Sequence, residues 1–176
     1  APGNESGGPG CPECDTVVDA TRGPRATFIT HLFGSRHMSE LESHHTGVVV
    51  SDLADAVSFY RDTLGFDVIE EFTLAGEGIA TAIDVDGVTG NFAHLDAGGS
   101  RIELIEYEPT GEDTRPAAIN GLGATHLGFE VEDIDAFYAG LPAEAEPVSE
   151  PQEIEIGIEI LFFRDPDGNF VEVVEG

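Results

Sequence analysis

An internal repeat constrains the fold of this 176-residue chain more than any other feature of its sequence. The segments "HTGVVVSDL" and "HLGFEVEDI", which begin at His45 and His126, share the pattern His-x-Gly-apolar-x-Val-x-Asp-apolar. They align without a gap at an offset of 81 residues (126 minus 45). A repeat of this kind indicates a duplicated structural unit rather than a single unbroken sheet.

The sequence of each repeat copy predicts a strand, then a helix, then further strands. Asp52 and Asp133 precede the helical segments, and aspartate is a favourable N-cap. The alternating runs that follow predict strands over 66–72, 78–85, 91–96 and 101–107, and then over 153–157, 159–165 and 169–175. "DPDGN" at 165–169 predicts a tight turn before the last strand. We therefore expect two tandem modules, at residues 43–108 and 122–176.

Side chains alternate across a strand, so sequence parity predicts the face that each one occupies. One face of each of four strands is apolar and is expected to be covered by a helix. The residues on these apolar faces are Val48 and Val50, Ile102 and Leu104, Leu127 and Phe129, and Val171 and Val173. The opposite faces carry His45, Glu103, His126 and Glu172.

Glu103 lies within the apolar run "RIELIE", where a carboxylate without a partner would be costly. Each module opens with a histidine strand and closes with a glutamate strand, so two curled modules could bring four ligating side chains together. Two imidazole nitrogens and two carboxylate oxygens suit a divalent transition metal and leave positions for water or substrate. We predict one such ion, held by His45, Glu103, His126 and Glu172.

Two further histidines, His44 and His94, have no counterpart in the repeat. We expect both to be structural neighbours of the site, with His44 at the strand entrance and His94 lining the cavity.

The charge balance restricts the partners of this chain. It has 35 acidic residues against 7 basic ones, all arginine, for a net charge of -28. This charge repels nucleic acid and anionic lipid, so neither is an expected partner. The absence of lysine and the spread of acids indicate a salt-rich cytoplasm, because molar salt shortens the Debye length to about 3 Å. No apolar run approaches the roughly 20 residues of a membrane span, and a cytoplasmic location is expected.

Residues 1–37 differ in composition from the rest and begin with "APGNESGGPG". We expect this segment to be a disordered or poorly structured extension, with the domain proper covering residues 38–176 from Met38. Cys11 and Cys14 form a single Cys-x-x-Cys with no second pair elsewhere in the chain, and we interpret it as incidental rather than a zinc or redox site.

The segments "HTGVVVSDLADAVSFYRDTLGF", "RIELIE", "HLGFEVEDID" and "DPDGNFVEVVE" resemble the vicinal oxygen chelate superfamily, which includes glyoxalase I, epimerases, extradiol dioxygenases and bleomycin resistance proteins. The resemblance covers about residues 43–175. It implies an α+β fold of two βαβββ modules forming a curled mixed sheet with a metal-binding cup, with the helices on the outer face and with dimerisation expected. The ligand positions of the superfamily fall on the same four residues predicted above.

The four-ligand set resembles glyoxalase I most, whereas the dioxygenases typically lack the carboxylate at position 103. The resemblance implies a lyase or isomerase that acts on a small thiol adduct of an α-ketoaldehyde, with nickel, zinc, cobalt, manganese or iron as the metal. Glu172 is the expected base and Glu103 the second catalytic carboxylate.

Substrate anchoring departs from the glyoxalase I pattern. Val49 and Tyr107 occupy the places where that enzyme commonly has an arginine and an asparagine that grip glutathione. Four arginines remain as candidates for binding an anionic substrate tail, although surface ion pairing is the commoner role of such residues; they are Arg61, Arg101, Arg115 and Arg164. The alternatives are a methylmalonyl-CoA epimerase-like enzyme, a non-haem iron dioxygenase and a metal-free small-molecule-binding module of the resistance-protein kind.

Overall fold

The computed structural model describes residues 41–176, of which 42–176 form one compact unit. The predicted extension at residues 1–37, Met38 and the Cys11–Cys14 pair lie outside the described residues, so the expectations about them stay predictions. No helix within the described range is long and apolar enough to cross a membrane.

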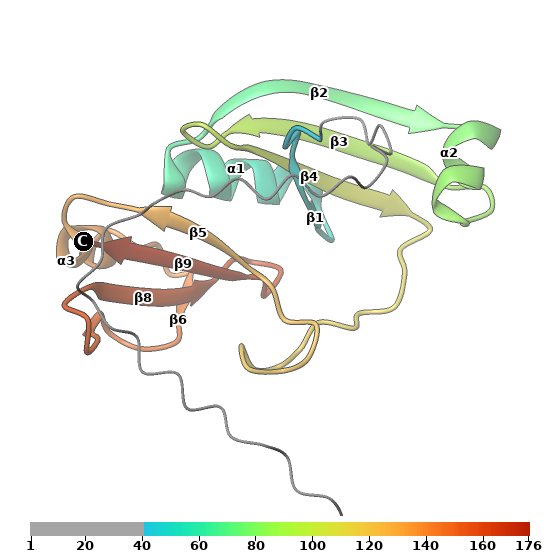
Figure 1. Ribbon diagram of the computed structural model, residues 1–176. Coiled ribbons are helices and arrows are strands. Elements are labelled where there is room, and N and C mark those ends of the chain that lie inside the picture. The colour runs from blue at the N-terminus through green and yellow to red at the C-terminus, as the bar shows by residue number, and fades with distance from the viewer. Residues whose placement is uncertain (1–40) are drawn as a thin grey trace, which may run out of the picture. The chain divides into compact units, whose positions relative to one another are not determined.

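The first module forms a four-stranded sheet in the order β1-β4-β3-β2 (Figure 1). Its elements are β1 (Thr46–Val49), α1 (Leu53–Leu64), β2 (Asp67–Ala75), α2 (Glu77–Ile83), β3 (Thr89–Asp96) and β4 (Arg101–Glu108). β1 pairs with β4 in parallel and the other pairs are antiparallel. The α+β class predicted from the sequence is therefore confirmed.

The second module repeats this plan with a five-stranded sheet, in which β5-β9-β8-β6 are neighbours and β7 also pairs with β8. Its elements are β5 (His126–Glu130), α3 (Ile134–Ala139), β6 (Glu146–Pro147), β7 (Gln152–Glu153), β8 (Glu159–Arg164) and β9 (Phe170–Glu175). β5 and β9 are parallel, as β1 and β4 are.

Both main helices begin where the sequence predicts. The Asp52 carboxylate accepts a hydrogen bond from the backbone N–H of Asp55 at 3.0 Å, and Asp133 accepts one from Ala136 at 2.8 Å. α1 ends at Leu64 and is capped by Gly65, whose φ of 72° is left-handed and so favours glycine. The "DPDGN" turn joins β8 to β9, with the Asp165 N–H donating to the Asn169 carbonyl at 3.0 Å.

The strand predicted at 78–85 is wrong, because this segment forms α2. β2 and β3 pair directly through Ala75 and Thr89, so the residues between them are excluded from the sheet ladder. Asp84 ends the helix in a left-handed conformation, φ 58°. The strand predicted at 153–157 is also mostly absent: only Glu153 pairs, in β7, and a turn at Gly157 follows.

The apolar faces of the two sheets contribute to one core, and α1 lies between the sheets (Figure 1). Leu104 of β4 and Val173 of β9 are both buried there, and the Phe59 ring of α1 lies 6.4 Å from the ring of Phe163 on β8. The face of each sheet that carries the predicted metal ligands, called its ligand face below, is the reverse of the face that packs in this core. α1 thus covers the side of the first sheet opposite the ligands. It lies between the two sheets (Figure 1), however, whereas the sequence predicted helices on the outer face.

Candidate metal centre

The parallel strand pairs set the position of each predicted ligand. Gly47 of β1 lies opposite Glu103 of β4, and Gly128 of β5 lies opposite Glu172 of β9. A Cβ on Gly128 would lie 3.6 Å from Oε2 of Glu172, and one on Gly47 would lie 3.5 Å from Cδ1 of Ile105, so both would make ordinary van der Waals contacts. The histidines, one at the start of β5 and one just before β1, project on the same side as the glutamates.

The structure brings the four predicted ligands together as two separate pairs. Nε2 of His45 lies 3.3 Å from Oε2 of Glu103, and Nε2 of His126 lies 3.2 Å from Oε2 of Glu172. The two pairs do not share one centre, because the ligand faces lie on the reverse sides of two sheets that share a core. Parity predicted the face that each ligand occupies, whereas the predicted meeting of all four within one chain is not observed.

A third histidine completes a larger group in the first module. Nε2 of His94, on β3, lies 2.7 Å from Oε1 of Glu103, so each Glu103 oxygen has a histidine partner. His45, His94 and Glu103 each offer a ligand atom within 4.8 Å of the others, and no other group of three such residues is found among residues 41–176. This donor set fits a divalent transition metal.

His94 was expected only to line the cavity, and its role as a Glu103 partner was missed. The signal was present in the hairpin: counting back from its Asp96–Arg101 end places His94 opposite Glu103. His44, expected at the strand entrance, lies beside the group, with its Nδ1 2.8 Å from Nδ1 of His45.

Aromatic and apolar side chains line the ligand face of the first sheet around this group. The rings of Phe72 and Phe92 stack at 5.0 Å, and Phe72 meets the His94 ring edge-on at 5.2 Å. Tyr107 packs edge-on against Phe92; burial, and then the nearby charge of Glu103, raise the pKa of its phenol. A substrate on this face would meet an apolar wall next to the ligands.

Three of the four arginines predicted as anion-binding candidates already have partners. Arg61 pairs with Asp62, Arg115 pairs with Asp113, and Arg164 donates to the carbonyl oxygens of Gly168 and Ala117. Arg101 differs, because within the described residues it forms no ion pair with a carboxylate. It lies on the same face of β4 as Glu103, and its Nη1 is 3.2 Å from Nε2 of His44.

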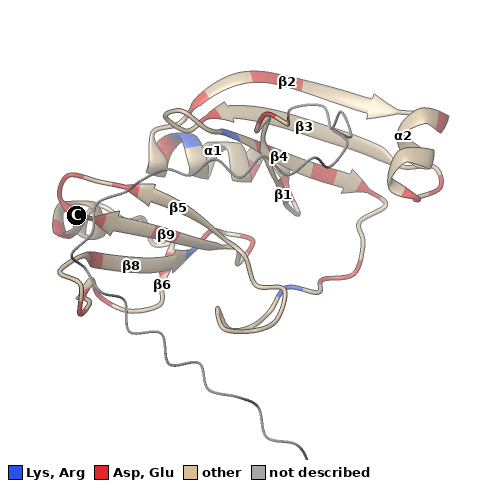
Figure 2. Cartoon of the chain, viewed as in Figure 1, with Lys and Arg blue, Asp and Glu red and all other residues tan. Residues whose placement is uncertain are grey.

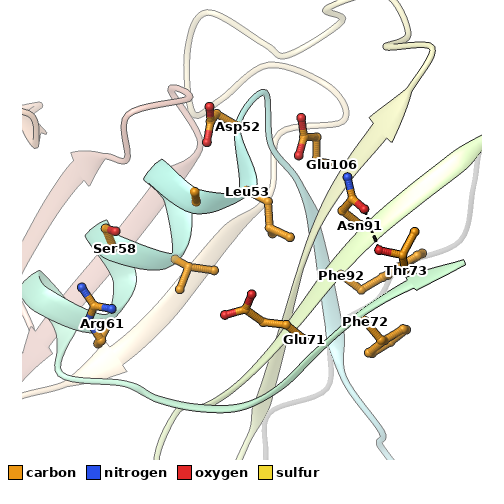
Figure 3. Close-up of a pocket in the computed structure, with 12 residues that line it drawn as sticks. Asp52, Leu53, Ser58, Arg61, Glu71, Phe72, Thr73, Asn91, Phe92 and Glu106 are labelled. Atoms are coloured by element: carbon orange, nitrogen blue, oxygen red, sulfur yellow. Dashed lines mark hydrogen bonds between the residues drawn. The ribbon is translucent and has the colours of Figure 1, made fainter.

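A hollow lies on the helix-covered side of the first sheet, opposite the ligand face (Figure 3). It has a volume of about 680 Å³ and opens between α1 and the helix-covered face of β2 and β3. Acidic and polar side chains line it, including Asp52, Glu71 and Glu106, and Thr73 donates to Asn91 at its wall at 2.8 Å. It contains none of the predicted metal ligands, so it is not the predicted site.

Comparison with known proteins agrees with this geometry. Residues 42–173 match the family described as the glyoxalase/bleomycin resistance protein/dioxygenase superfamily. The chain belongs to this superfamily.

Relatives of this superfamily member include proteins with and without a stated activity. The uncharacterized protein YaeR of Escherichia coli is 31% identical over 140 residues, which cover 75% of this chain and 94% of YaeR. A 2-epi-5-epi-valiolone epimerase from Actinomyces is 28% identical, covering 74% of this chain and 77% of the epimerase. The crystal structure of a glyoxalase family protein from Bacillus cereus aligns with a TM-score of 0.71 at 27% identity, covering 80% and 97% of the two chains.

Proposed function

We propose that this protein is a metal-dependent lyase or isomerase of the glyoxalase type, which moves a proton between adjacent carbons of a small thiol adduct of an α-ketoaldehyde. The observation that carries the proposal is the pair of histidine–glutamate contacts, which recur at equivalent register positions of both sheets. Membership of the superfamily supports it.

The proposed centre forms between two copies of the chain. Each chain presents one histidine–glutamate pair on each of two sheets whose ligand faces lie on opposite sides of a shared core. A centre with all four ligands then needs the first module of one copy and the second module of another. The half-exposed imidazoles of His45 and His126, 35% and 42% accessible, leave room for this approach. So does Val49, an apolar side chain that is 54% exposed on the first ligand face.

A divalent ion at this centre would supply Lewis-acid polarisation of the substrate oxygens. The two glutamates differ in their freedom to accept a proton. Both oxygens of Glu103 contact histidines, and its side chain is 11% exposed. Glu172 is 24% exposed and contacts a histidine through Oε2 alone among the described residues. This asymmetry supports Glu172 as the base and Glu103 as the residue that holds the site together.

The surroundings favour a substrate with a small or apolar carrier over glutathione. Val49 and Tyr107 cannot supply the charge and the amide that the glyoxalase I pattern uses, and Phe72 and Phe92 extend the apolar wall. Arg101, which has no carboxylate partner among residues 41–176, is the proposed partner of a substrate carboxylate beside the ligand group. Arg101→Ala is therefore expected to raise KM more than it lowers kcat.

Metal content and one substitution test this function. The protein purified without chelator is expected to contain about one divalent ion per chain and to convert methylglyoxal plus a thiol to a thioester. Glu172→Gln removes the proton acceptor and is expected to lower kcat by at least about 100-fold. Glu106→Gln, on the opposite face of the first sheet, is the matched control and is expected to keep full activity. Full activity of Glu172→Gln would remove this residue from the chemistry, and a metal-free protein would favour a binding module.

An epimerase is the second candidate, because the relative from Actinomyces is named a 2-epi-5-epi-valiolone epimerase. Both reactions begin with removal of a proton next to a carbonyl group. Deuterium exchange into a polyhydroxy ketone without thioester formation would favour the epimerase. Oxygen uptake with ferrous iron would favour a dioxygenase over both.

A further inference from the structure

His94 is buried on the ligand face of the first sheet, and both of its ring nitrogens have carboxylate partners. It lies directly across the β3–β4 ladder from Glu103, with Nε2 2.7 Å from Oε1 of that residue. Its Nδ1 lies 3.0 Å from Oε1 of Glu70 on β2. The His94 side chain is only 7% exposed, so these contacts decide its orientation.

The second module shows what packing alone requires at this position. Phe162 of β8 lies across from Glu172 as His94 lies across from Glu103. The Phe162 ring meets the His126 ring edge-on at 5.5 Å, while the His45 and His94 rings are 6.0 Å apart. A phenyl ring therefore fills the equivalent place in the same scaffold. Packing alone does not explain why the first module has an imidazole, with two ring nitrogens, at position 94.

A β-bulge directs Glu70 toward this histidine. The register between β2 and β3 shifts between Val68 and Glu70, so Ile69 is an extra residue in β2. Without the shift, Glu70 would lie opposite Ala93 and point toward the helix. With it, Glu70 lies opposite His94 on the ligand face. Bulges next to functional sites commonly re-aim a side chain in this way.

From these three observations we infer that His94 is itself a metal ligand. With His45 and Glu103 it forms a two-histidine, one-carboxylate group that is complete within the first module. The three ligand atoms lie within 4.8 Å of one another, a spacing that an ion about 2.0–2.2 Å from each can span with small adjustments. Nδ1–H of His94 donates to Glu70, which selects the tautomer whose Nε2 lone pair faces the ion, and such carboxylate–histidine–metal arrangements are common.

The two modules are then unequal partners in the centre. The first module holds the ion with three ligands, and the second adds His126 and Glu172 to an ion already in place. This inference rests on the metal centre of the proposed function, but not on its substrate, its base or its oligomeric state.

Cobalt binding by the full chain tests the inference in a background that lacks the second pair. In the double variant His126→Ala/Glu172→Ala, Co²⁺ titration followed by visible absorption and by elemental analysis is expected to give about one ion per chain, held by three ligands. Adding His94→Phe, which copies the ring at position 162, is expected to lower the affinity by more than about 100-fold, and Glu70→Gln by about 10- to 100-fold. Glu71→Gln makes the same exchange as Glu70→Gln on the helix-covered face of the same strand, away from the group, and is expected to leave the affinity unchanged.

The remaining outcomes of the Co²⁺ titration distinguish a failure of this inference from a failure of the proposed function. Unchanged Co²⁺ affinity and spectrum after His94→Phe would overturn the inference, provided that circular dichroism shows the variant folded. The same holds if the double variant binds no Co²⁺ while the unmodified chain does. If the unmodified chain binds no Co²⁺ either, the proposed function fails together with the inference. If His94 binds the ion but methylglyoxal is not converted, only the proposed function fails.

Discussion

Tyr60 and Asp165 form a buried hydrogen bond that joins the first helix to the last turn. The Tyr60 hydroxyl donates to Oδ2 of Asp165 at 2.9 Å, and the Asn169 backbone and side-chain amides donate to the same carboxylate. Burial, and then the adjacent charge of Asp165, raise the pKa of the Tyr60 phenol far above its ordinary value of 10.0. The phenol therefore stays neutral in the folded protein.

This raised pKa predicts a loss of stability in alkaline solution. Below pH 10 the phenol is protonated in both the folded and the unfolded chain, so its contribution is complete. As the pH rises above about 10 the unfolded chain can release the proton and the folded chain cannot, so the free energy of unfolding falls. Urea unfolding from pH 8 to 11 is expected to show a shallower decline for Tyr60→Phe than for the unmodified protein. An equal decline for both would show that Tyr60 is not the group responsible.

At neutral pH the same variant loses one buried hydrogen bond. The Asp165 carboxylate keeps its two Asn169 donors, so a cost of about 1–3 kcal/mol is expected for Tyr60→Phe.

The two helices of the repeat, α1 and α3, each begin at an N-cap aspartate, and each aspartate is expected to stabilise the folded protein. The Asp52 carboxylate satisfies the N–H of Asp55 in the first turn of α1. Asp52→Ala is expected to lower the free energy of unfolding by about 1 kcal/mol, and Asp133→Ala, at α3, by a similar amount. Asp62→Ala, near the end of α1, removes only a surface ion pair with Arg61 and serves as the control. Urea denaturation would measure all three, and equal values for Asp52→Ala and Asp62→Ala would contradict the capping role.

The elements show how far local sequence determines this fold. β4 and β9 were predictable because Ile102 and Val171 alternate with residues of the opposite face, and the N-caps were predictable from their chemistry. α2 was not, because the run from Gly78 to Val85 alternates weakly and only the direct pairing of β2 with β3 excludes it from the sheet.

The local sequence likewise determines only part of the candidate site. Parity predicted which face of its strand each ligand occupies, but not that β1 pairs with β4 and so brings His45 to Glu103. It could not predict which faces meet, because that depends on the packing of both sheets around α1. The bulge at Ile69, which brings Glu70 to His94, has no evident local signal either.

The whole molecule carries its negative charge over both modules, on strands and loops alike (Figure 2). With a net charge of -28, repulsion between these groups opposes the compact state. Added salt weakens this repulsion, because the Debye length, beyond which charges are largely screened, falls from about 10 Å at 0.1 M to about 3 Å at 1 M. The melting temperature is therefore expected to rise by several degrees from low to molar potassium chloride, measured by circular dichroism. A melting temperature that stays constant or falls would contradict adaptation to high salt.

Placing the ligand faces on the outer sides of a shared core also has a genetic consequence. If each centre combines the first module of one copy with the second module of another, two separately inactive alleles can rescue each other. A mixed dimer of Glu103→Gln and Glu172→Gln chains has one centre with both defects and one with neither. Random reassociation of equal amounts should therefore restore about a quarter of the unmodified activity, whereas centres built within single chains would give no recovery at all.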